Sequence, residues 1–233
     1  MINYSNPFLI KIRTLGQKLG VLRPLVKTYR RIFKIAYESN FDVQMMMETS
    51  TNDIVWDVGA NIGYFTQKFA EKVGEDGKVY AFEPAPNTFL SLVNNCSNYK
   101  NITCKNIALS NESGNLAFRD SGINNDPTNG IVNFDTPNAI QVTVATGDEL
   151  ILTKSVPIPT IIKIDVEGYE LEVIKGMKEM LNNQLVKKIF IEIHFFELNK
   201  RGMETGANEI IQNLVESGFK VKWTDPSHII ASR

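Results

Sequence analysis

From Ile54 onward, short apolar runs alternate with segments of helical periodicity, and this alternation leaves few architectures open. Continuous apolar strands separated by amphipathic helices predict an α/β fold with a parallel sheet covered on both faces. Strands are predicted at 53–58, 78–83, 101–109, 160–166 and 187–196, and helices at 64–73, 87–96, 170–181 and 207–218. A closing β-hairpin is predicted from 219–224 and 228–232.

The segment 111–148 interrupts this alternation. It is rich in Asn, Gly, Pro and Asp, and its two stretches with strand character lie at 115–120 and 140–146. We interpret it as an inserted β-hairpin with a long polar loop at its tip. The predicted organisation is a helical segment at 1–45 followed by one α/β domain at 46–233, a division that fits a length of 233 residues.

The N-terminal segment is strongly basic. Residues 1–37 contain eight Lys or Arg and no acidic residue, whereas the rest of the chain has 17 basic and 26 acidic residues. Its apolar residues recur at helical spacing, which predicts basic amphipathic helices. Such helices either lie on an anionic membrane surface, through residues 8–37, or pack on the core or on a second subunit of a homo-oligomer. We favour the packing interpretation and leave peripheral contact with the inner face of the membrane open.

The composition argues against several classes of protein. A net charge of −1 argues against a nucleic-acid partner. Two cysteines without a CxxC motif or a Cys/His cluster argue against a zinc site and a disulfide framework, and they fit a reduced, cytoplasmic setting. No apolar run is long enough to span a bilayer, and we expect no secretory signal.

The turn after the first predicted strand carries the strongest ligand-binding signal. Ligands of open α/β sheets bind at the carboxyl ends of the strands, and Gly59 and Gly63 allow a sharp turn and a close approach to a ligand. A dinucleotide fingerprint requires G-x-G-x-x-G, but Asn61 and Tyr64 replace its second and third glycines. Asp57, at the strand tip, would repel a diphosphate and attract the ammonium and sulfonium groups of S-adenosyl-L-methionine. The charges therefore favour this methyl donor over NAD.

Glu83 adds weaker support at the end of the second predicted strand, twenty positions after Gly63. A carboxylate there can accept hydrogen bonds from both hydroxyls of a ribose, which either cofactor contains. Taken singly, the two glycines are equally well explained by a tight turn, and Glu83 by a solvated strand end. Their combination favours cofactor binding.

Five segments, in this order over about residues 52–232, resemble the FkbM-type methyltransferase family: VWDVGANIGYFTQKFA, VYAFEPAPNTFLSLVNN, NIALSNESGNLAF, KIDVEGYELEVIKG and IFIEIH. The resemblance implies dependence on S-adenosyl-L-methionine and a class I, Rossmann-like three-layer fold. The sheet would be mostly parallel, seven-stranded and ordered 3-2-1-4-5-7-6, with strand seven antiparallel. Family members mostly methylate hydroxyls on sugars, glycans or natural-product metabolites. The donor-binding residues that the resemblance implies are Asp57, Gly59, Asn61, Gly63, Tyr64, Glu83, Pro84, Ala108 and Asp165.

The chain departs from the family pattern at two places. Family members often have Thr-Leu-Asp before the fourth strand, where this chain reads ATGDEL with Gly147 in the middle, and the 120–138 loop is individual. Both places lie where acceptor contacts are expected. The acceptor therefore stays open, as a small molecule or a glycan.

The candidate catalytic residues lie at the carboxyl ends of the fourth and fifth predicted strands. Because strand side chains alternate between faces, Lys163 shares a face with Asp165, and Glu192 shares one with His194. Polar groups in buried strands are unfavourable unless they bind one another or a ligand, so we expect these four to converge beside the donor methyl. His194 is the predicted general base, because its ordinary pKa lies near neutrality, and Asp165 is the alternative. Lys163 is expected to pair with Asp57, Asp165 or Glu192.

Less specific interpretations of these residues stay open. Lys163 and Glu192 could form a structural salt bridge, and His194 could lie on the surface. Glu167 and Glu170 occur at a predicted helix start, where acidic side chains stabilise the first turn. We favour that role for Glu170 and leave Glu167 open.

Asp165, Glu192 and His194 could also form a facial metal triad, although we expect a site without a metal. The predicted activity is S-adenosyl-L-methionine-dependent O-methylation. Methylation of an amine is one alternative, and a non-catalytic cofactor-binding module is another. A nicotinamide-dependent dehydrogenase is disfavoured by Asn61 and Asp57.

Overall fold

The computed structural model describes residues 39–120, 130–132 and 135–233. The helices and the membrane contact predicted at 8–37 therefore lie outside the described residues. The expected boundary between residues 45 and 46 falls inside helix α3 (Ser39–Met47). Within the described ranges, no helix has both the length and the apolar character needed to cross a bilayer.

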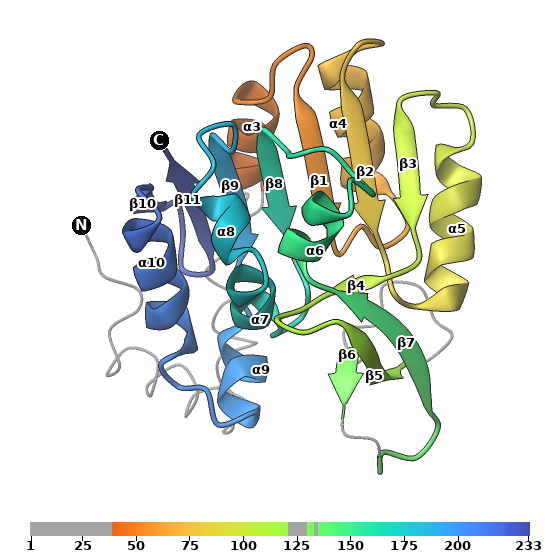
Figure 1. Ribbon diagram of the computed structural model, residues 1–233, viewed down its shortest axis with the longest axis vertical. Helices are drawn as coiled ribbons and strands as arrows, with labels where there is room; N and C mark the ends of the chain where they lie inside the picture. The colour runs from red at the N-terminus through yellow and green to blue at the C-terminus, as the bar shows by residue number, and fades with distance from the viewer. Residues whose placement is uncertain (1–38, 121–129, 133–134) are drawn as a thin grey trace, which may run out of the picture.

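A seven-stranded sheet forms the centre of the fold, in the order β10-β11-β9-β8-β1-β2-β3 (Figure 1). β11 is antiparallel to both of its neighbours, and the other pairs are parallel. This confirms the strand order and the antiparallel strand that the family resemblance implied. The strands are β1 (Ile54–Val58), β2 (Lys78–Phe82), β3 (Ile102–Lys105), β8 (Ile161–Ile164), β9 (Lys188–Glu192), β10 (Lys220–Trp223) and β11 (His228–Ser232).

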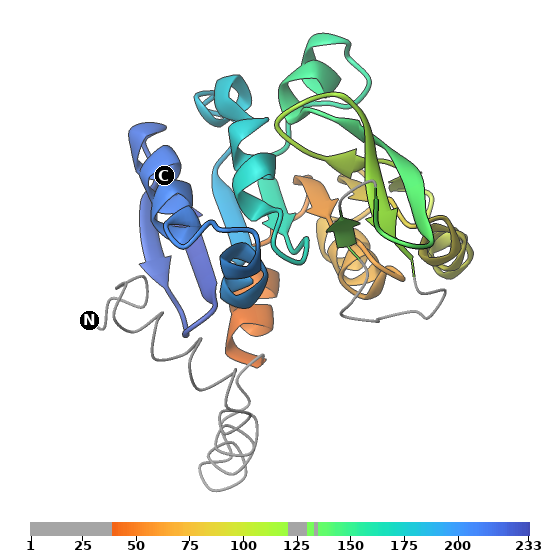
Figure 2. The same ribbon diagram turned by 90° about the horizontal axis from the view of Figure 1, so that it is seen from below.

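Helices cover both faces of this sheet, as the continuous apolar strands require (Figures 1 and 2). On one face, α3 and α4 (Tyr64–Val73) bury Met45, Phe69 and Val73 against Val55 and Val79. The helix α5 (Pro86–Cys96) packs on the same face through Leu92. The opposite face is covered by α6 (Gly147–Leu152), α7 (Glu170–Lys175), α8 (Lys178–Leu181) and α10 (Gly206–Glu216).

The segment 111–148 contributes to a second, four-stranded sheet in the order β4-β7-β5-β6. Its strands are β4 (Ala108–Leu109), β5 (Gly114–Arg119), β6 (Gly130–Val132) and β7 (Ala139–Ala145). The predicted hairpin is confirmed by the antiparallel pairing of β5 with β7, and β6 is an additional strand. The predicted strand at 101–109 divides between the two sheets, as β3 and β4. The division lies at Asn106, whose side chain donates to the carbonyls of Glu83 and Pro84 at 2.8 and 3.0 Å and so fixes the chain where it leaves β3.

Two predicted elements are wrong in their extent. The helix at 170–181 breaks at Gly176, where a Cβ atom would lie 1.9 Å from the Ser110 carbonyl oxygen, and it forms α7 and α8 instead. The strand at 187–196 ends at Glu192, because the Ile193 amide donates to Ser227 and Phe195–Lys200 forms helix α9. His194 therefore lies in the turn before α9 and does not share a strand face with Glu192.

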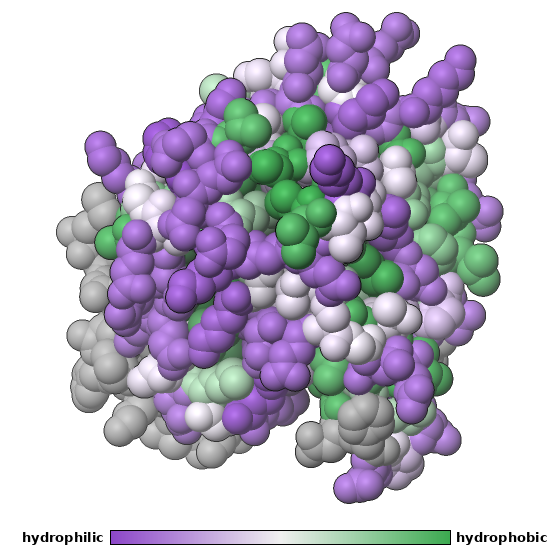
Figure 3. Space-filling model, viewed as in Figure 1, coloured by the Kyte–Doolittle hydropathy of each residue, from purple (hydrophilic) through white to green (hydrophobic). Residues whose placement is uncertain are grey.

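The carboxyl ends of the parallel strands form one edge of the large sheet, and the small sheet and α9 lie at that edge (Figure 1). Figure 3, in the same view, shows a largely hydrophilic face that is hollowed at its lower edge between α9 and the small sheet. Hydrophobic side chains gather on this face over α6 and α5, where Leu152 and Leu90 are exposed. The arrangement leaves a recess at the edge where the polar residues were predicted.

Candidate active site

A cavity of about 240 Å³ lies at the carboxyl edge of the large sheet. Its walls come from the β1–α4 turn, the end of β2, β4, the small sheet and the segment after β8. Six of the nine predicted donor-binding residues line it: Gly59, Asn61, Glu83, Pro84, Ala108 and Asp165. The sequence did not single out Phe118 and Ile131 of the small sheet, or Thr88 and Tyr169, which also line it.

The β1–α4 turn depends on Gly59. Its φ is +79°, and a Cβ atom there would lie 1.8 Å from the Asp165 carbonyl oxygen. The amides of Gly59 and Ala60 both donate to the Phe82 carbonyl, at 3.1 and 3.0 Å. The turn therefore packs directly on the backbone after β8, at a separation that no side chain permits.

Gly63 and Tyr64 lie outside the lining of this cavity. Gly63 precedes α4 with a φ of +93°, and a Cβ atom there would lie 2.9 Å from Cys96 Sγ and from Leu92 Cδ1. Gly63 thus allows α5 to pack closely on the turn. Tyr64 is 58% exposed and faces a second cavity instead.

Glu83 is held by two backbone amides. The Asn61 amide donates to its Oε2 at 3.0 Å, and the Ala85 amide donates to its Oε1 at 2.9 Å. Burial raises the pKa of Glu83 to about 7, against the lowering effect of both amides and of Lys163. A half-ionised carboxylate with free lone pairs therefore faces the cavity at neutral pH.

Asp57 is fully buried and bound to other side chains. The Thr66 hydroxyl donates to its Oδ2 at 2.6 Å, and Lys163 Nζ lies 3.1 Å from its Oδ1, an ion pair without hydrogen-bond geometry. Lys163 also lies 3.5 Å from Asp165 Oδ2 and donates to the Gly59 carbonyl at 3.0 Å. Burial lowers the pKa of Lys163, but Asp57 and Asp165 raise it further, so the net shift is upward. Of its three expected partners, Lys163 contacts Asp57 and Asp165 and so joins the β1 turn to β8.

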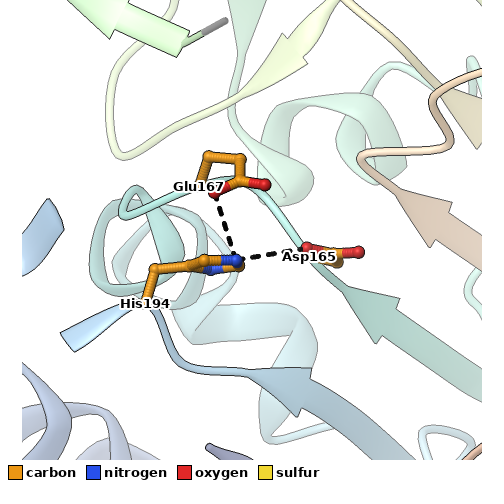
Figure 4. Close-up of side chains that lie close together, drawn as sticks. All are labelled: Asp165, Glu167 and His194. Carbon is orange, nitrogen blue, oxygen red and sulfur yellow. Dashed lines mark ion pairs between the residues drawn. The ribbon is translucent and has the colours of Figure 1, made fainter. Parts of the chain in front are cut away.

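A second group of side chains converges on His194 (Figure 4). Its Nε2 lies 3.2 Å from Glu167 Oε2, 3.7 Å from Asp165 Oδ1 and 4.0 Å from Glu192 Oε1. Its Nδ1 lies 2.7 Å from Glu170 Oε1. His194 therefore lies among four carboxylates, three of them near Nε2 and one at Nδ1.

Glu170 has a role that the sequence analysis missed. It is the first residue of α7, as predicted, but its side chain is fully buried and its Oε1 also accepts from the Gly168 amide at 2.8 Å. Among the residues that the structure describes, none gives its Oε2 a hydrogen-bond partner. The turn that places it here contains Glu167 and Gly168 at φ values of +50° and +92°. An acidic residue at a helix start gave no sign of this buried position.

The clustered carboxylates change the ionisation of their neighbours. Burial lowers the pKa of His194, but Glu170, Asp165 and Glu167 outweigh it and raise the pKa to about 10. Burial and the other carboxylates raise the pKa of Glu167 to about 7, against the lowering effect of His194. The cluster thus carries more negative than positive charge, and the protonated His194 is the cation at its centre.

A second cavity, of about 380 Å³, has Asp165 in its lining, as the first cavity does. Aromatic rings of Phe41, Tyr64 and Phe65 line it together with polar residues that include Glu192 and His228. His228 is fixed through Nδ1, 2.8 Å from Asp225 Oδ1, and its Nε2 lies 3.4 Å from Glu192 Oε2. Because Asp165 lines both cavities, a molecule in one would lie close to a molecule in the other.

Comparison with known proteins identifies relatives of this chain. The sequence model of the methyltransferase FkbM domain family matches residues 57–221 of this chain. The hexuronic acid methyltransferase AglP of Haloferax volcanii is 36% identical over 151 residues, which cover 64% of this chain and 59% of AglP. The match thus spans less than two thirds of that relative.

Two solved structures share the fold. Methyltransferase FkbM from Methylobacillus flagellatus KT has a TM-score of 0.55 at 19% identity, covering 79% of this chain and 44% of that one. A Streptococcus mutans protein assigned to the methyltransferases, solved in complex with SAH (S-adenosyl-L-homocysteine), has a TM-score of 0.51 at 10% identity, covering 85% of this chain and 98% of that one. At these identities the likeness concerns the fold alone.

Proposed function

The chain belongs to the FkbM methyltransferase family, and from this premise we propose that it transfers a methyl group from S-adenosyl-L-methionine to a hydroxyl of a carbohydrate or related small molecule. The observation that carries the proposal is the cavity at the carboxyl edge, which is lined by the amide-held Glu83 and by Asp165 and Glu167, the two carboxylates that contact His194. Such a cavity can hold an adenosine at Glu83 and present a reactive methyl group to the polar cluster.

Glu83 is the proposed ribose contact. Its two oxygens already accept from backbone amides, and their remaining lone pairs can accept from the ribose hydroxyls. Phe82, Ile107 and Phe118 provide apolar walls nearby that suit an adenine ring. Pro84 and Ala108 line the same part of the cavity.

The cationic end of the donor is proposed to lie beside Asp165. The sequence suggested Asp57 for this contact, but its carboxylate is enclosed by Thr66 and Lys163. Asp165 lines the cavity directly, and its side chain is 30% exposed. We therefore assign Asp57 a positioning role, in which it holds Lys163 and, through the Gly59 carbonyl, the turn beneath the donor.

The second cavity is the proposed acceptor site. Sugars present apolar C–H faces that suit aromatic rings and hydroxyls that suit polar side chains, and this cavity offers both. The similarity to AglP, a hexuronic acid methyltransferase, supports a carbohydrate acceptor. Asp165 would then lie beside both the donor methyl and the acceptor hydroxyl.

Methyl transfer needs close placement and a route for one proton. Placement of the two substrates side by side at Asp165 supplies the proximity that accounts for much of such catalysis. The hydroxyl proton passes to a carboxylate beside the acceptor, either Asp165 or Glu192, because the raised pKa of His194 leaves this imidazole protonated at neutral pH. Glu170 fixes the orientation of the imidazole. Cavities that enclose both substrates would also keep water from competing as the acceptor.

A labelled-methyl transfer screen tests the proposal. The chain is incubated with methyl-labelled S-adenosyl-L-methionine and with neutral sugars, uronic-acid glycans or amines. We expect label in a carbohydrate fraction, in a bond that survives mild base as an ether does. Label in amines alone would support N-methylation, and donor binding without transfer to any fraction would support a non-catalytic module. Either result contradicts the proposal.

A further inference from the structure

The three side chains around His194 Nε2 have the spacing of metal ligands. Asp165, Glu167 and His194 each offer one ligand atom, and these atoms all lie within 4.8 Å of one another. Ligands that bind a small divalent ion at about 2.0–2.2 Å are separated from one another by roughly 3–4 Å. The distances from Nε2, 3.2 Å to Glu167 and 3.7 Å to Asp165, fall in this range (Figure 4).

Glu170 is an independent observation that points the same way. Histidines that bind metals almost always donate their other ring N–H to a carboxylate or carbonyl, which fixes the tautomer. Glu170 Oε1 lies 2.7 Å from Nδ1, on the side of the ring away from the two carboxylates. It is fully buried, and no described residue gives its Oε2 a hydrogen-bond partner. A buried carboxylate so placed holds a proton on Nδ1, so that an ion that displaces the proton from Nε2 meets a lone pair directed at Asp165 and Glu167.

The charges of this region also call for a cation. Asp165, Glu167, Glu170 and Glu192 all lie within 4.0 Å of a His194 nitrogen. Two further buried groups at this edge can carry positive charge, and both have other carboxylate partners. Lys163 is engaged by Asp57 as well as by Asp165, and His228 is engaged by Asp225 as well as by Glu192. Like charges this close are unfavourable, and a divalent ion relieves them more fully than one imidazole can.

We propose that Asp165, Glu167 and His194 bind one divalent transition-metal ion that coordinates the acceptor oxygen. This replaces the expectation of a metal-free site, and Glu167 takes the place that the sequence gave to Glu192. One imidazole and two carboxylates suit Mn²⁺ or a similar ion better than Mg²⁺ or Ca²⁺, which prefer oxygen ligands alone. The side chains of Asp165 and Glu167 are 30% and 40% exposed, so coordination positions of the ion remain open toward the cavities that Asp165 lines.

The chemical consequence rests on the proposed function. A bound ion polarises the acceptor hydroxyl and lowers its pKa, so that the O–H proton leaves to Glu192 or to water. The oxygen then forms a bond to the methyl carbon while the carbon–sulfur bond breaks. The sulfur keeps that electron pair, and the sulfonium becomes the neutral thioether of S-adenosyl-L-homocysteine.

Mn²⁺ binding to the full chain, freed of any affinity tag and treated with a chelator, tests the site without an acceptor. Electron paramagnetic resonance of free Mn²⁺ should show one bound ion per chain. His194→Asn and Glu167→Gln should lose this binding, and Glu170→Gln should weaken it about 10- to 100-fold. Glu209→Gln is the matched control, because this carboxylate on α10 pairs with Lys175 of α7 and its loss should leave Mn²⁺ affinity unchanged.

Two outcomes would overturn the metal site. The first is wild-type protein that binds no Mn²⁺, in which case the imidazole alone balances the carboxylates. The second is binding that His194→Asn and Glu167→Gln leave intact while circular dichroism shows both variants folded. Titration of the same samples with S-adenosyl-L-homocysteine separates this failure from that of the proposed function, because donor binding depends on Glu83 and needs no metal.

Discussion

Glu170 and His194, 24 residues apart in the sequence, are joined by a contact of 2.7 Å between Oε1 and Nδ1 inside the fold. One residue begins α7 and the other precedes α9, so the contact fixes the segments after β8 and β9 relative to each other. It also determines which nitrogen of His194 faces Asp165 and Glu167. The geometry of the proposed reaction centre therefore depends on a residue that touches neither substrate.

Glu170→Gln should separate transfer from donor binding. The amide keeps the shape of the side chain but no longer holds the imidazole through a charged hydrogen bond. We expect kcat to fall by about 10²–10³-fold, within the range that a positioned acid–base group contributes, with the affinity for S-adenosyl-L-homocysteine unchanged. Single-turnover transfer and calorimetry measure the two quantities, and Glu209→Gln is the control. Equal losses of kcat and of S-adenosyl-L-homocysteine affinity would indicate that Glu170 has a general structural role instead.

Glu83 predicts a pH dependence of donor binding. Its pKa is raised to about 7 by burial, with two backbone amides and Lys163 opposing the shift and Asp57 adding to it. Because the ionised form is the better acceptor for ribose hydroxyls, affinity should rise with pH and level off above about 8. Glu83→Gln should bind weakly and lose this pH dependence. Calorimetry between pH 6 and 8.5 measures the donor affinity of both proteins. The same dependence of affinity on pH in Glu83→Gln as in the wild type would contradict the assignment of Glu83 as the ribose contact.

Gly59→Ala should destabilise the fold and abolish donor binding. Its positive φ alone costs a side chain about 1–2 kcal/mol, and the added Cβ would lie 1.8 Å from the Asp165 carbonyl oxygen. Gly202→Ala is a matched control, because Gly202 has a φ of +72° and no described atom lies within 4 Å of its added Cβ. Urea denaturation should show a larger loss for Gly59→Ala. Equal losses would mean that backbone strain, and not the close approach to β8, explains the glycine.

Lys163 and Asp57 should behave as a coupled pair. Lys163→Met leaves the buried Asp57 carboxylate without its cation, and loss of one partner of a buried pair typically costs about 3–5 kcal/mol. The double variant with Asp57→Asn should be more stable than Lys163→Met alone, since both charges are then removed. A double-mutant cycle by urea denaturation gives the coupling energy. Strict additivity would show that the 3.1 Å ion pair carries no net stabilisation.

The arrangement of the large sheet was predictable because its signal is local and repeated. Apolar strands followed by helices specify parallel pairing, and the β1–α4 turn showed its glycines in the sequence. The end of β9 was not predictable in the same way. Residues 193–196 are apolar and aromatic, as in a strand, but the bond from Ile193 to Ser227 and the helix that starts at Phe195 override that local preference.

The site was predictable in its position and less so in its contacts. Asp165, Glu192 and His194 converge because parallel strands end at one edge. The direction of the Asp57 carboxylate depends instead on Thr66 and Lys163, which lie 9 and 106 residues along the chain. The burial of Glu170 depends on the turn at Glu167 and Gly168, which both have positive φ values. A glutamate gives no sequence signal for a positive φ, so this turn could not be predicted at Glu167.

Calorimetric titration of the full chain with S-adenosyl-L-methionine, S-adenosyl-L-homocysteine and NAD tests most directly whether the cavity beside Glu83 holds a methyl donor. The structure predicts that both sulfur-containing ligands bind one per chain, that Glu83→Ala abolishes the binding, and that NAD gives no heat. Binding of NAD with no response to the other two would contradict a methyl-donor site.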